Sequence, residues 1–246
     1  MASIAAHSET LRRILPKGLA DKVEPNLRLA NLKPGQILIG HQDFSTEVFV
    51  VLEGTLRVEL HSMNGREIIL ADIGEGALVG EFAALDDQPR SASVTATSKC
   101  LLARIPGALF KSAALGDPES AEWLTTRLVG QIRQLTERVF ELNALAVRNR
   151  LHCELLRMSL DAGVAGNAAT ISKSPTHVQL ASKIGTHREA VTRELQYLQK
   201  QGITRQEGRT LTIADVAKLA EFIRAAAGDI ELIQRANQAG IGPAPD

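Results

Sequence analysis

The sequence predicts an α+β chain in three parts, because its hydropathy pattern changes twice along the chain. Residues 36–106 form many short β-rich runs separated by glycines, which is typical of a sandwich, jelly roll or barrel. A helical period then takes over, and the last third of the chain is predicted as short helices around a small hairpin. We therefore expect a β-domain over residues 1–117, a long helix over 118–147 and a mainly helical domain over 148–246.

The composition of the 246 residues excludes several classes of protein. Hydrophobic residues make up 44% of the chain, which is enough for a packed core. Aromatic residues make up only 3%, which argues against a stacking platform for single-stranded nucleic acid. The formal net charge is zero, so any affinity for DNA must come from a local charge cluster. Neither a membrane-length apolar run nor a signal-peptide core is present, so we expect a cytoplasmic protein without a membrane partner.

Cysteine and histidine spacing argues against a metal site or a catalytic centre. Cys100 and Cys153 belong to no CxxC motif, so we expect two free thiols. The histidines show no HxH or HxxxH spacing, and we expect no bound metal. We also find no nucleophile paired with a base, and we therefore expect no enzyme.

The predicted β-domain begins with helical segments. Residues 8–31 carry apolar side chains at roughly helical spacing, and a Pro-Gly pair at 34–35 ends that pattern. Among the β-rich runs that follow, an Asn-Gly pair at 64–65 lies between two apolar runs, which is a strong hairpin signal.

A narrow apolar stripe follows the predicted long helix. Its members are spaced 4, 3, 4, 3 and 4 residues apart: Leu128, Ile132, Leu135, Val139, Leu142 and Ala146. This spacing is the a/d pattern of a coiled coil over nearly three heptads. Packing of an amphipathic helix on its own domain is the alternative, but two apolar positions in seven favour a second helix. The stripe therefore predicts a homodimer.

Residues 80–94 combine side chains that suit a phosphorylated ribose. Gly80 permits a close approach of the backbone to a ligand. Arg90 can bind a phosphate through a charge-assisted bond, and Ser91 adds a hydroxyl donor. Glu81 cannot bind phosphate, but its carboxylate can accept hydrogen bonds from sugar hydroxyls. A structural ion pair between Glu81 and Arg90 is the alternative interpretation.

The same segment, GEFAALDDQPRSASV, resembles the phosphate-binding cassette of cyclic-nucleotide-binding domains. The resemblance covers about residues 20–145 and implies that the β-domain is a double-stranded β-helix, or jelly roll. It implies that Glu81 binds the ribose 2′-hydroxyl and that Arg90 binds the cyclic phosphate. The other residues of the implied site are Gly80, Phe82, Ala83 and Ser91, of which Phe82 and Ala83 contribute backbone amides.

The resemblance implies cAMP or cGMP as an allosteric effector. Thr136 on the long helix falls near the implied position of the base, although a threonine on a solvated helix face is an equal alternative. Ser91 occupies a position where cGMP-selective kinase domains carry a hydroxyl residue, yet cAMP-binding bacterial activators also have serine there. We favour cAMP, with cGMP or both nucleotides as alternatives.

Residues 176–195 have the pattern of a helix-turn-helix. Ala181 is small where two helices would touch, and Gly185 stands at the expected turn. The apolar positions that would pack the two helices are Leu180, Ile184, Val191 and Leu195. Glu194 departs from the pattern, because an apolar residue is usual there, and we expect its side chain to point to solvent. Residues 173–209 hold seven Lys/Arg against three Asp/Glu, which gives the local positive charge that DNA binding needs.

The run HREAVTR at 187–193 resembles the recognition helix of the catabolite-activator (Crp/Fnr) family of bacterial transcription regulators. Residues 202–213 resemble the wing that follows it, with a turn at 207–208, so we expect a winged helix-turn-helix. The resemblance implies a double-stranded promoter site of two TGTGA-like half-sites. Arg188 and Arg193 suit guanine, and Glu189 suits cytosine. The remaining candidate DNA contacts are Thr176, His177, His187 and Thr192.

Other parts of the C-terminal domain are predicted with less detail. Residues 161–176 are polar and are predicted to be a linker. A last helix is expected from about 214 to 226 with a second beyond it, as a helical extension whose role the sequence does not show.

Two rival functions follow from the same family resemblance. One is a family member that senses haem or redox state, which the intact Glu81 and Arg90 argue against. The other is a cyclic-nucleotide-binding regulatory subunit of a partner enzyme, which the helix-turn-helix argues against. RNA polymerase is a further partner that the resemblance implies, and the sequence does not distinguish an activator from a repressor.

Overall fold

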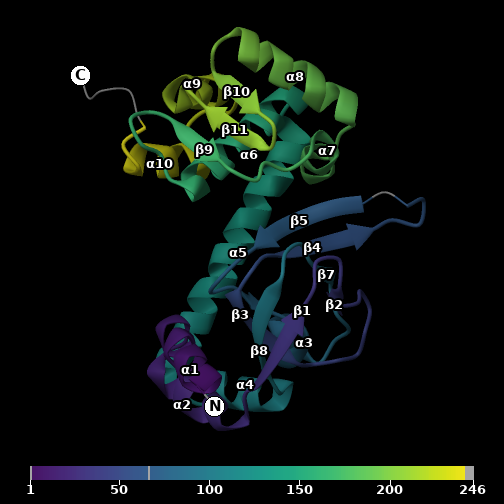
Figure 1. The fold of residues 1–246 in the computed structure, drawn as a ribbon, viewed down its shortest axis with the longest axis vertical. Helices are drawn as coiled ribbons and strands as arrows, with labels where there is room; N and C mark the ends of the chain where they lie inside the picture. The colour runs from purple at the N-terminus through teal and green to yellow at the C-terminus, as the bar shows by residue number, and fades with distance from the viewer. Residues whose placement is uncertain (1, 66, 242–246) are drawn as a thin grey trace. The chain divides into compact units, whose positions relative to one another are not determined.

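A computed structural model of the chain describes residues 2–65 and 67–241 (Figure 1). The chain divides into two compact units between Ile132 and Arg133, a point that lies within the long helix α5 (Pro118–Ala144). We describe the two units separately. No helix within these described ranges is long and apolar enough to cross a membrane.

The first unit is a β-domain with helices at both ends of its sequence. Two short helices and a 3-10 turn precede the strands: α1 (Ala2–Ile14), α2 (Lys17–Val23) and η1 (Glu24–Asn26). The strands are β1 (Arg28–Leu32), β2 (Ile37–Ile39), β3 (Val48–Glu53), β4 (Leu56–His61), β5 (Glu67–Ile73), β6 (Leu78–Val79), β7 (Ser93–Ala96) and β8 (Cys100–Ile105). Helix α3 (Glu81–Asp86) lies between β6 and β7, and α4 (Gly107–Leu115) leads to α5.

The strands form two four-stranded antiparallel sheets, which confirms the predicted jelly roll. One sheet has the order β1-β8-β3-β6 and the other the order β2-β7-β4-β5. Both sheets contribute to one cluster of buried side chains, which joins Phe49 and Val51 of β3 to Leu56 of β4 and Val94 of β7. The predicted hairpin is the antiparallel pair β4–β5, in which His61 lies opposite Glu67.

Strand β3 is buried on both faces, and it therefore connects the sheets to the helices. Its residues Val48, Val50 and Leu52 pack with α1, α2, α4 and the start of α5, while Phe49 and Val51 point to the other sheet. This alternation follows from the two-residue period of a strand. A continuous apolar run is thus explained by packing on two sides.

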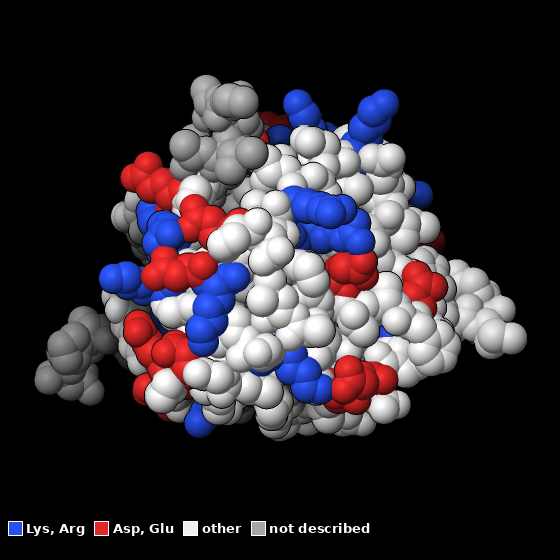
Figure 2. Space-filling model, turned by 90° about the horizontal axis from the view of Figure 1, so that it is seen from below, with Lys and Arg blue, Asp and Glu red and all other residues white. Residues whose placement is uncertain are grey.

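One face of the molecule mixes charges of both signs. Figure 2 shows one face on which Lys and Arg side chains lie interspersed with Asp and Glu among uncharged residues. This mixture agrees with the formal net charge of zero for the whole chain.

The second unit is a helical domain with a small sheet. After the end of α5 its elements are α6 (Val147–Ala162), β9 (Ala169–Ile171), α7 (His177–Ile184), α8 (Arg188–Lys200), β10 (Thr204–Glu207), β11 (Thr210–Ile213), α9 (Val216–Ala227) and α10 (Glu231–Gln238). Helix α6 is buried over most of its middle and packs against α7, α8, α9, α10 and β9. One apolar cluster holds all of these elements together.

The predicted winged helix-turn-helix is confirmed, with one correction to the linker. Strands β10 and β11 pair as the expected hairpin, in which Glu207 lies opposite Thr210. Residues 161–176 are not only a linker, because they contain β9, which pairs with β11 and makes the sheet three-stranded. The segment is mostly polar, and its strand is short because only three residues reach the edge of the hairpin. Helices α9 and α10 are the predicted extension.

A buried ion cluster joins the last part of α5 to α6 and α7. The Glu154 carboxylate of α6 is 2% exposed and accepts from Arg138 at 2.6 Å, Arg157 at 3.0 Å and Lys183 at 3.2 Å. Arg157 also reaches Glu141 of α5 at 2.5 Å. Burial opposes ionisation of Glu154, but Arg138, Lys183 and Arg157 outweigh it and lower its pKa to about 2. The cluster is therefore a network in which three partly buried cations neutralise two buried carboxylates.

Replacement of Glu154 tests this cluster. Glu154→Gln is expected to lower the free energy of unfolding at neutral pH by about 3–5 kcal/mol, because the cations lose their buried partner. The matched control Glu221→Gln changes an exposed residue of α9 and should alter the free energy by less than about 0.5 kcal/mol. Urea denaturation measures both variants, and equal small effects would show that the cluster contributes nothing.

The effect of Glu154→Gln on the free energy of unfolding depends on pH, and the direction follows from the pKa. The pKa of Glu154 lies near 2, below its ordinary value of 4.5. Its ionised form therefore stabilises the fold fully above pH 4.5, and this contribution is lost as the pH falls towards 2. The free energies of wild type and Glu154→Gln should consequently converge over that range.

Candidate functional site

The first candidate site begins at a turn that requires glycine. Gly80 has a φ of 87° and stands immediately before α3. A Cβ atom at this position would lie 2.5 Å from Nη1 of Arg90 and 2.7 Å from the carbonyl oxygen of Glu47. The turn therefore brings the backbone of Gly80 close to the guanidinium of Arg90.

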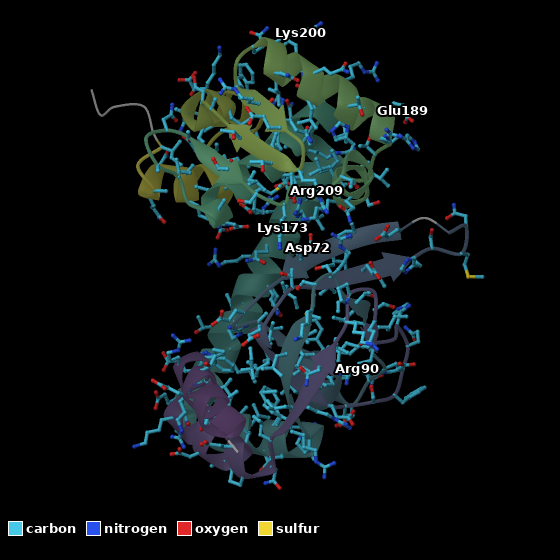
Figure 3. All side chains as sticks on the ribbon, in the orientation of Figure 1. Asp72, Arg90, Lys173, Glu189, Lys200 and Arg209 are labelled. Atoms are coloured by element: carbon cyan, nitrogen blue, oxygen red, sulfur yellow. The ribbon has the colours of Figure 1, made fainter. Side chains whose placement is uncertain are left out.

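Arg90, which is labelled in Figure 3, is held by three acceptors from its own chain. Its Nη1 donates to the carbonyl oxygen of Gly80 at 2.7 Å, Nη2 to that of Glu47 at 2.7 Å, and Nε to Oγ of Ser45 at 3.1 Å. The side chain is 3% exposed, and burial lowers its pKa against the opposing effect of Glu47, Glu81 and Asp43. A guanidinium has five N–H donors, so two more can serve an anion.

Glu81 is the first residue of α3 and is buried close to Arg90. Its pKa is raised by burial, while its own backbone N–H, Gln131, Arg127 and Arg90 act in the opposite direction. Its Oε1 accepts from Nε2 of Gln131 on α5 at 3.1 Å. The hydrogen-bond partner of Glu81 is thus the amide of Gln131. This bond differs from the alternative interpretation, in which Glu81 pairs directly with Arg90.

Gln131 is a residue of this site that the sequence analysis missed. A carboxylate only accepts, so Gln131 must turn its NH₂ group to Glu81. Its Oε1 is buried and has no hydrogen-bond partner among the described residues. The amide is therefore oriented with a spare acceptor beside Glu81. Nothing in the local sequence marks this glutamine, because its partner Glu81 is 50 residues away in the chain.

The other predicted ligand residues lie in different surroundings. Ser91 is exposed just before β7, Phe82 is 42% exposed on α3, and Ala83 beside it is buried. Thr136 lies on the exposed surface of α5, in the second unit. The structure thus brings Gly80, Glu81 and Arg90 together, and the ligand contacts of Ser91, Phe82, Ala83 and Thr136 stay predictions. Among the described residues, no three His, Cys, Asp or Glu side chains group as a metal site.

The second candidate site is the helix pair α7–α8. Thr176 begins α7 with a capping box, in which its Oγ1 accepts from the backbone of Gln179 and its own N–H donates to the Gln179 side chain. Gly185 ends α7 with a φ of 66°, which allows the sharp turn into α8. The predicted packing residues Leu180, Ala181, Ile184, Val191 and Leu195 are all buried.

The outer face of α8 carries the predicted base-reading side chains. Arg188, Glu189 and Arg193 are exposed, as is His187 just before the helix. Glu189 and Lys200 lie near the two ends of α8 (Figure 3). Two other candidates contact each other: Nδ1 of His177 lies 2.8 Å from Oγ1 of Thr192, which donates to the carbonyl oxygen of Arg188. The structure thus places Thr192 and His177 as a link between α7 and α8.

The expectation for Glu194 is wrong. Its side chain does not point to solvent but lies 16% exposed, with Oε1 2.7 Å from Nε2 of His152 on α6. A carboxylate can take an apolar position here because a buried histidine supplies a donor. The sequence alone could not show this, since the two residues are 42 positions apart.

Family models match the two parts of the chain in which the candidate sites lie. The family model of the cyclic nucleotide-binding domain matches residues 29–116, and that of the Crp-like helix-turn-helix domain matches residues 149–222. The chain belongs to the Crp/Fnr superfamily of transcription regulators. Its β-domain and its helix-turn-helix are those of this superfamily, joined on one chain by α5.

Individual Crp/Fnr proteins are similar along most of the chain. The CRP-like cAMP-activated global transcriptional regulator of Mycobacterium tuberculosis is 25% identical over 216 residues, which are 84% of this chain and 96% of the relative. The cAMP-activated global transcriptional regulator Vfr of Pseudomonas aeruginosa is 26% identical over 68% of this chain and 79% of its own. The structure of FixK2 from Bradyrhizobium japonicum has a TM-score of 0.70 at 21% identity and covers 79% of this chain and 96% of FixK2.

Substitution of Gly80 tests the turn at the first site. Gly80→Ala should lower the free energy of unfolding by at least about 1 kcal/mol more than Gly35→Ala, because its Cβ also collides with Arg90 and Glu47. Gly35 is a matched control, because its φ is 84° and an added Cβ would meet no atom within 4 Å. Chemical denaturation gives both values, and equal losses would mean that Gly80 supplies backbone freedom only.

Proposed function

We propose that this chain is a homodimeric transcription regulator that binds a pseudo-palindromic DNA site under the control of cAMP or cGMP. The observation that carries the proposal is the turn at Gly80 beside the buried Glu81 and Arg90, on a chain that also has the α7–α8 pair. An allosteric regulator needs two distinct binding sites. Here they are an anion-binding site in one unit and a DNA-binding helix pair in the other.

The effector is proposed from the chemistry of the pocket. Arg90 offers two further N–H donors to the cyclic phosphate, and Glu81 accepts from the ribose 2′-hydroxyl. Ser91 and the amides of Phe82 and Ala83 add donors to the phosphate, while Thr136 contacts the base. Two relatives named as cAMP-activated support cAMP over cGMP as the effector.

Gln131 adds an acceptor to this proposed pocket. Its Oε1 is buried beside Glu81 without a partner among the described residues, and a bound ligand with a hydroxyl or amino group can supply the missing donor. The ribose 2′-hydroxyl and the amino group of a purine both have the required chemistry. Gln131 is therefore proposed as a ligand contact in addition to the residues predicted from the sequence.

The homodimer is proposed from the exposed stripe of α5. Ile132, Leu135, Val139 and Leu142 are 48–61% exposed, although all four are large and apolar. Exposed large apolar side chains at a/d spacing are expected to pack against the same helix of a second copy. In this proposal residues 1–117 bind nucleotide, 118–147 form the dimer and 148–246 bind DNA.

DNA recognition is proposed through the outer face of α8. Arg188 and Arg193 are exposed and suit guanine O6 and N7, and Glu189 suits the amino group of cytosine. Four further residues lie at or near the helix ends: Thr176, His177, His187 and Thr192. They contact the DNA backbone or hold the recognition helix in place. The proposed site is two TGTGA-like half-sites about one helical turn apart.

A DNA titration at fixed salt tests the proposal, because phosphate contacts make affinity depend on salt. Protein is titrated into a labelled TGTGA-N6-TCACA duplex, or into a duplex selected from random sequences, without nucleotide, with cAMP and with cGMP. One nucleotide is expected to tighten binding by about tenfold or more. Glu81→Gln should lose that response, while Glu75→Gln, at an exposed position, should keep it. Equal affinity under all three conditions would contradict nucleotide control.

A further inference from the structure

The recognition helix has a carboxylate on its inward face. Val191, Leu195 and Leu198 are the buried residues of α8, and their spacing of 4 and 3 marks the side that packs on the core. Glu194 lies three residues after Val191, so it belongs to the same side. It is followed by buried Leu195 and preceded by exposed Arg193. The carboxylate is thus placed directly under the DNA-reading surface.

A buried histidine of α6 holds this carboxylate. His152 is 3% exposed, and its Nε2 lies 2.7 Å from Oε1 of Glu194. Since a carboxylate only accepts, Nε2 must carry the proton, and in the neutral ring Nδ1 is then a bare acceptor. That Nδ1 atom is buried without a hydrogen-bond partner among the described residues.

The surroundings of His152 favour its neutral form. Phe222 of α9 lies beside the ring, with a centroid distance of 5.7 Å. The charged groups that act on the ring are Glu194 of α8 and Arg148 of α6. Burial lowers the pKa of His152 below 6.5 and Arg148 acts in the same direction, while Glu194 opposes them. A second proton would place an N–H at Nδ1, where no acceptor is available within the described residues.

We propose that His152 and Glu194 are a proton-sensitive positioning pair that holds the recognition helix α8 in place, so that acid weakens DNA binding by this chain. The proposal rests on the proposed DNA-binding function and concerns its regulation. In the neutral pair, the bond fixes α8 against α6. In acid, the ring gains its proton most easily when it is released towards water, and that release also frees Glu194 and loosens α8.

The sign of the effect follows from the position of the pKa. Because it lies below 6.5 in the folded chain, the pair stabilises α8 fully above pH 6.5, and this contribution is lost as the pH falls from 6.5 through the folded value. A gain of positive charge at the DNA-facing side would strengthen binding to phosphates. A loss of affinity in acid therefore has the sign expected for the His152–Glu194 pair and not for added charge at that side.

The test measures DNA affinity and amide hydrogen exchange of α8 in the full chain at several pH values. The duplex is one selected by the wild-type protein at about pH 7.5, and salt is held constant. Between about pH 7.5 and pH 5.5 wild-type affinity should fall by about threefold or more. Over the same range, the protection of the α8 amides, corrected for intrinsic exchange, should also fall.

Two variants separate positioning from simple packing. His152→Gln keeps an N–H donor for Glu194 but cannot titrate, so it should bind DNA as wild type does near pH 7.5 and lose the acid response. His152→Leu removes the donor and should weaken binding and α8 protection at both pH values. An unchanged acid response in His152→Gln would overturn the proposal, and that variant remains decisive if His152→Leu does not fold.

Failure of the proposed function would look different from failure of this inference. If no selected duplex binds at any pH, the DNA-binding proposal is wrong, and the hydrogen exchange of α8 then decides the inference by itself. An acid-dependent loss of α8 protection in wild type that is absent in His152→Gln supports the pair. Protection that does not change with pH in wild type contradicts it.

Discussion

The burial of charged side chains is the constraint on which both units depend. A charge removed from water is costly unless hydrogen bonds or opposite charges replace its hydration. In the first unit, two backbone carbonyl oxygens and a hydroxyl meet the guanidinium of Arg90, and this arrangement requires the turn at Gly80. In the second unit, Glu154 is met by three cations from α5, α6 and α7. These contacts help to position the candidate sites, because Arg90 and Glu154 each bind residues from several neighbouring elements.

Sequence reasoning succeeded where the relevant residues are close together in the chain. The turn and carboxylate at residues 80 and 81, the α7–α8 pair and the β10–β11 hairpin are all local patterns, and the structure contains them. It failed where the partner is distant. Three features depend on tertiary packing: the hydrogen bond from Gln131 to Glu81, the bond between His152 and Glu194, and the pairing of β9 with β11. A polar residue at an apolar position was visible in the sequence, but its partner on another helix was not.

The two units of this Crp/Fnr chain contain its cyclic nucleotide-binding domain and its helix-turn-helix domain. Helix α5 begins in the first unit and ends in the second, so it joins the two domains through continuous backbone. The ion cluster around Glu154 attaches the last part of α5 to α6 and α7. Under the proposed function, a nucleotide changes DNA binding only if it binds two arrangements of the regulator with different affinities.

Calorimetry tests whether the proposed nucleotide and DNA sites are coupled reciprocally. The affinity of cAMP and of cGMP is measured on the free protein and on the protein saturated with its selected duplex. Linkage requires DNA to tighten the effector by the same factor by which the effector tightens DNA. We predict such a matched increase for one of the two nucleotides. Equal nucleotide affinity with and without DNA would contradict it, because the two sites would then act independently.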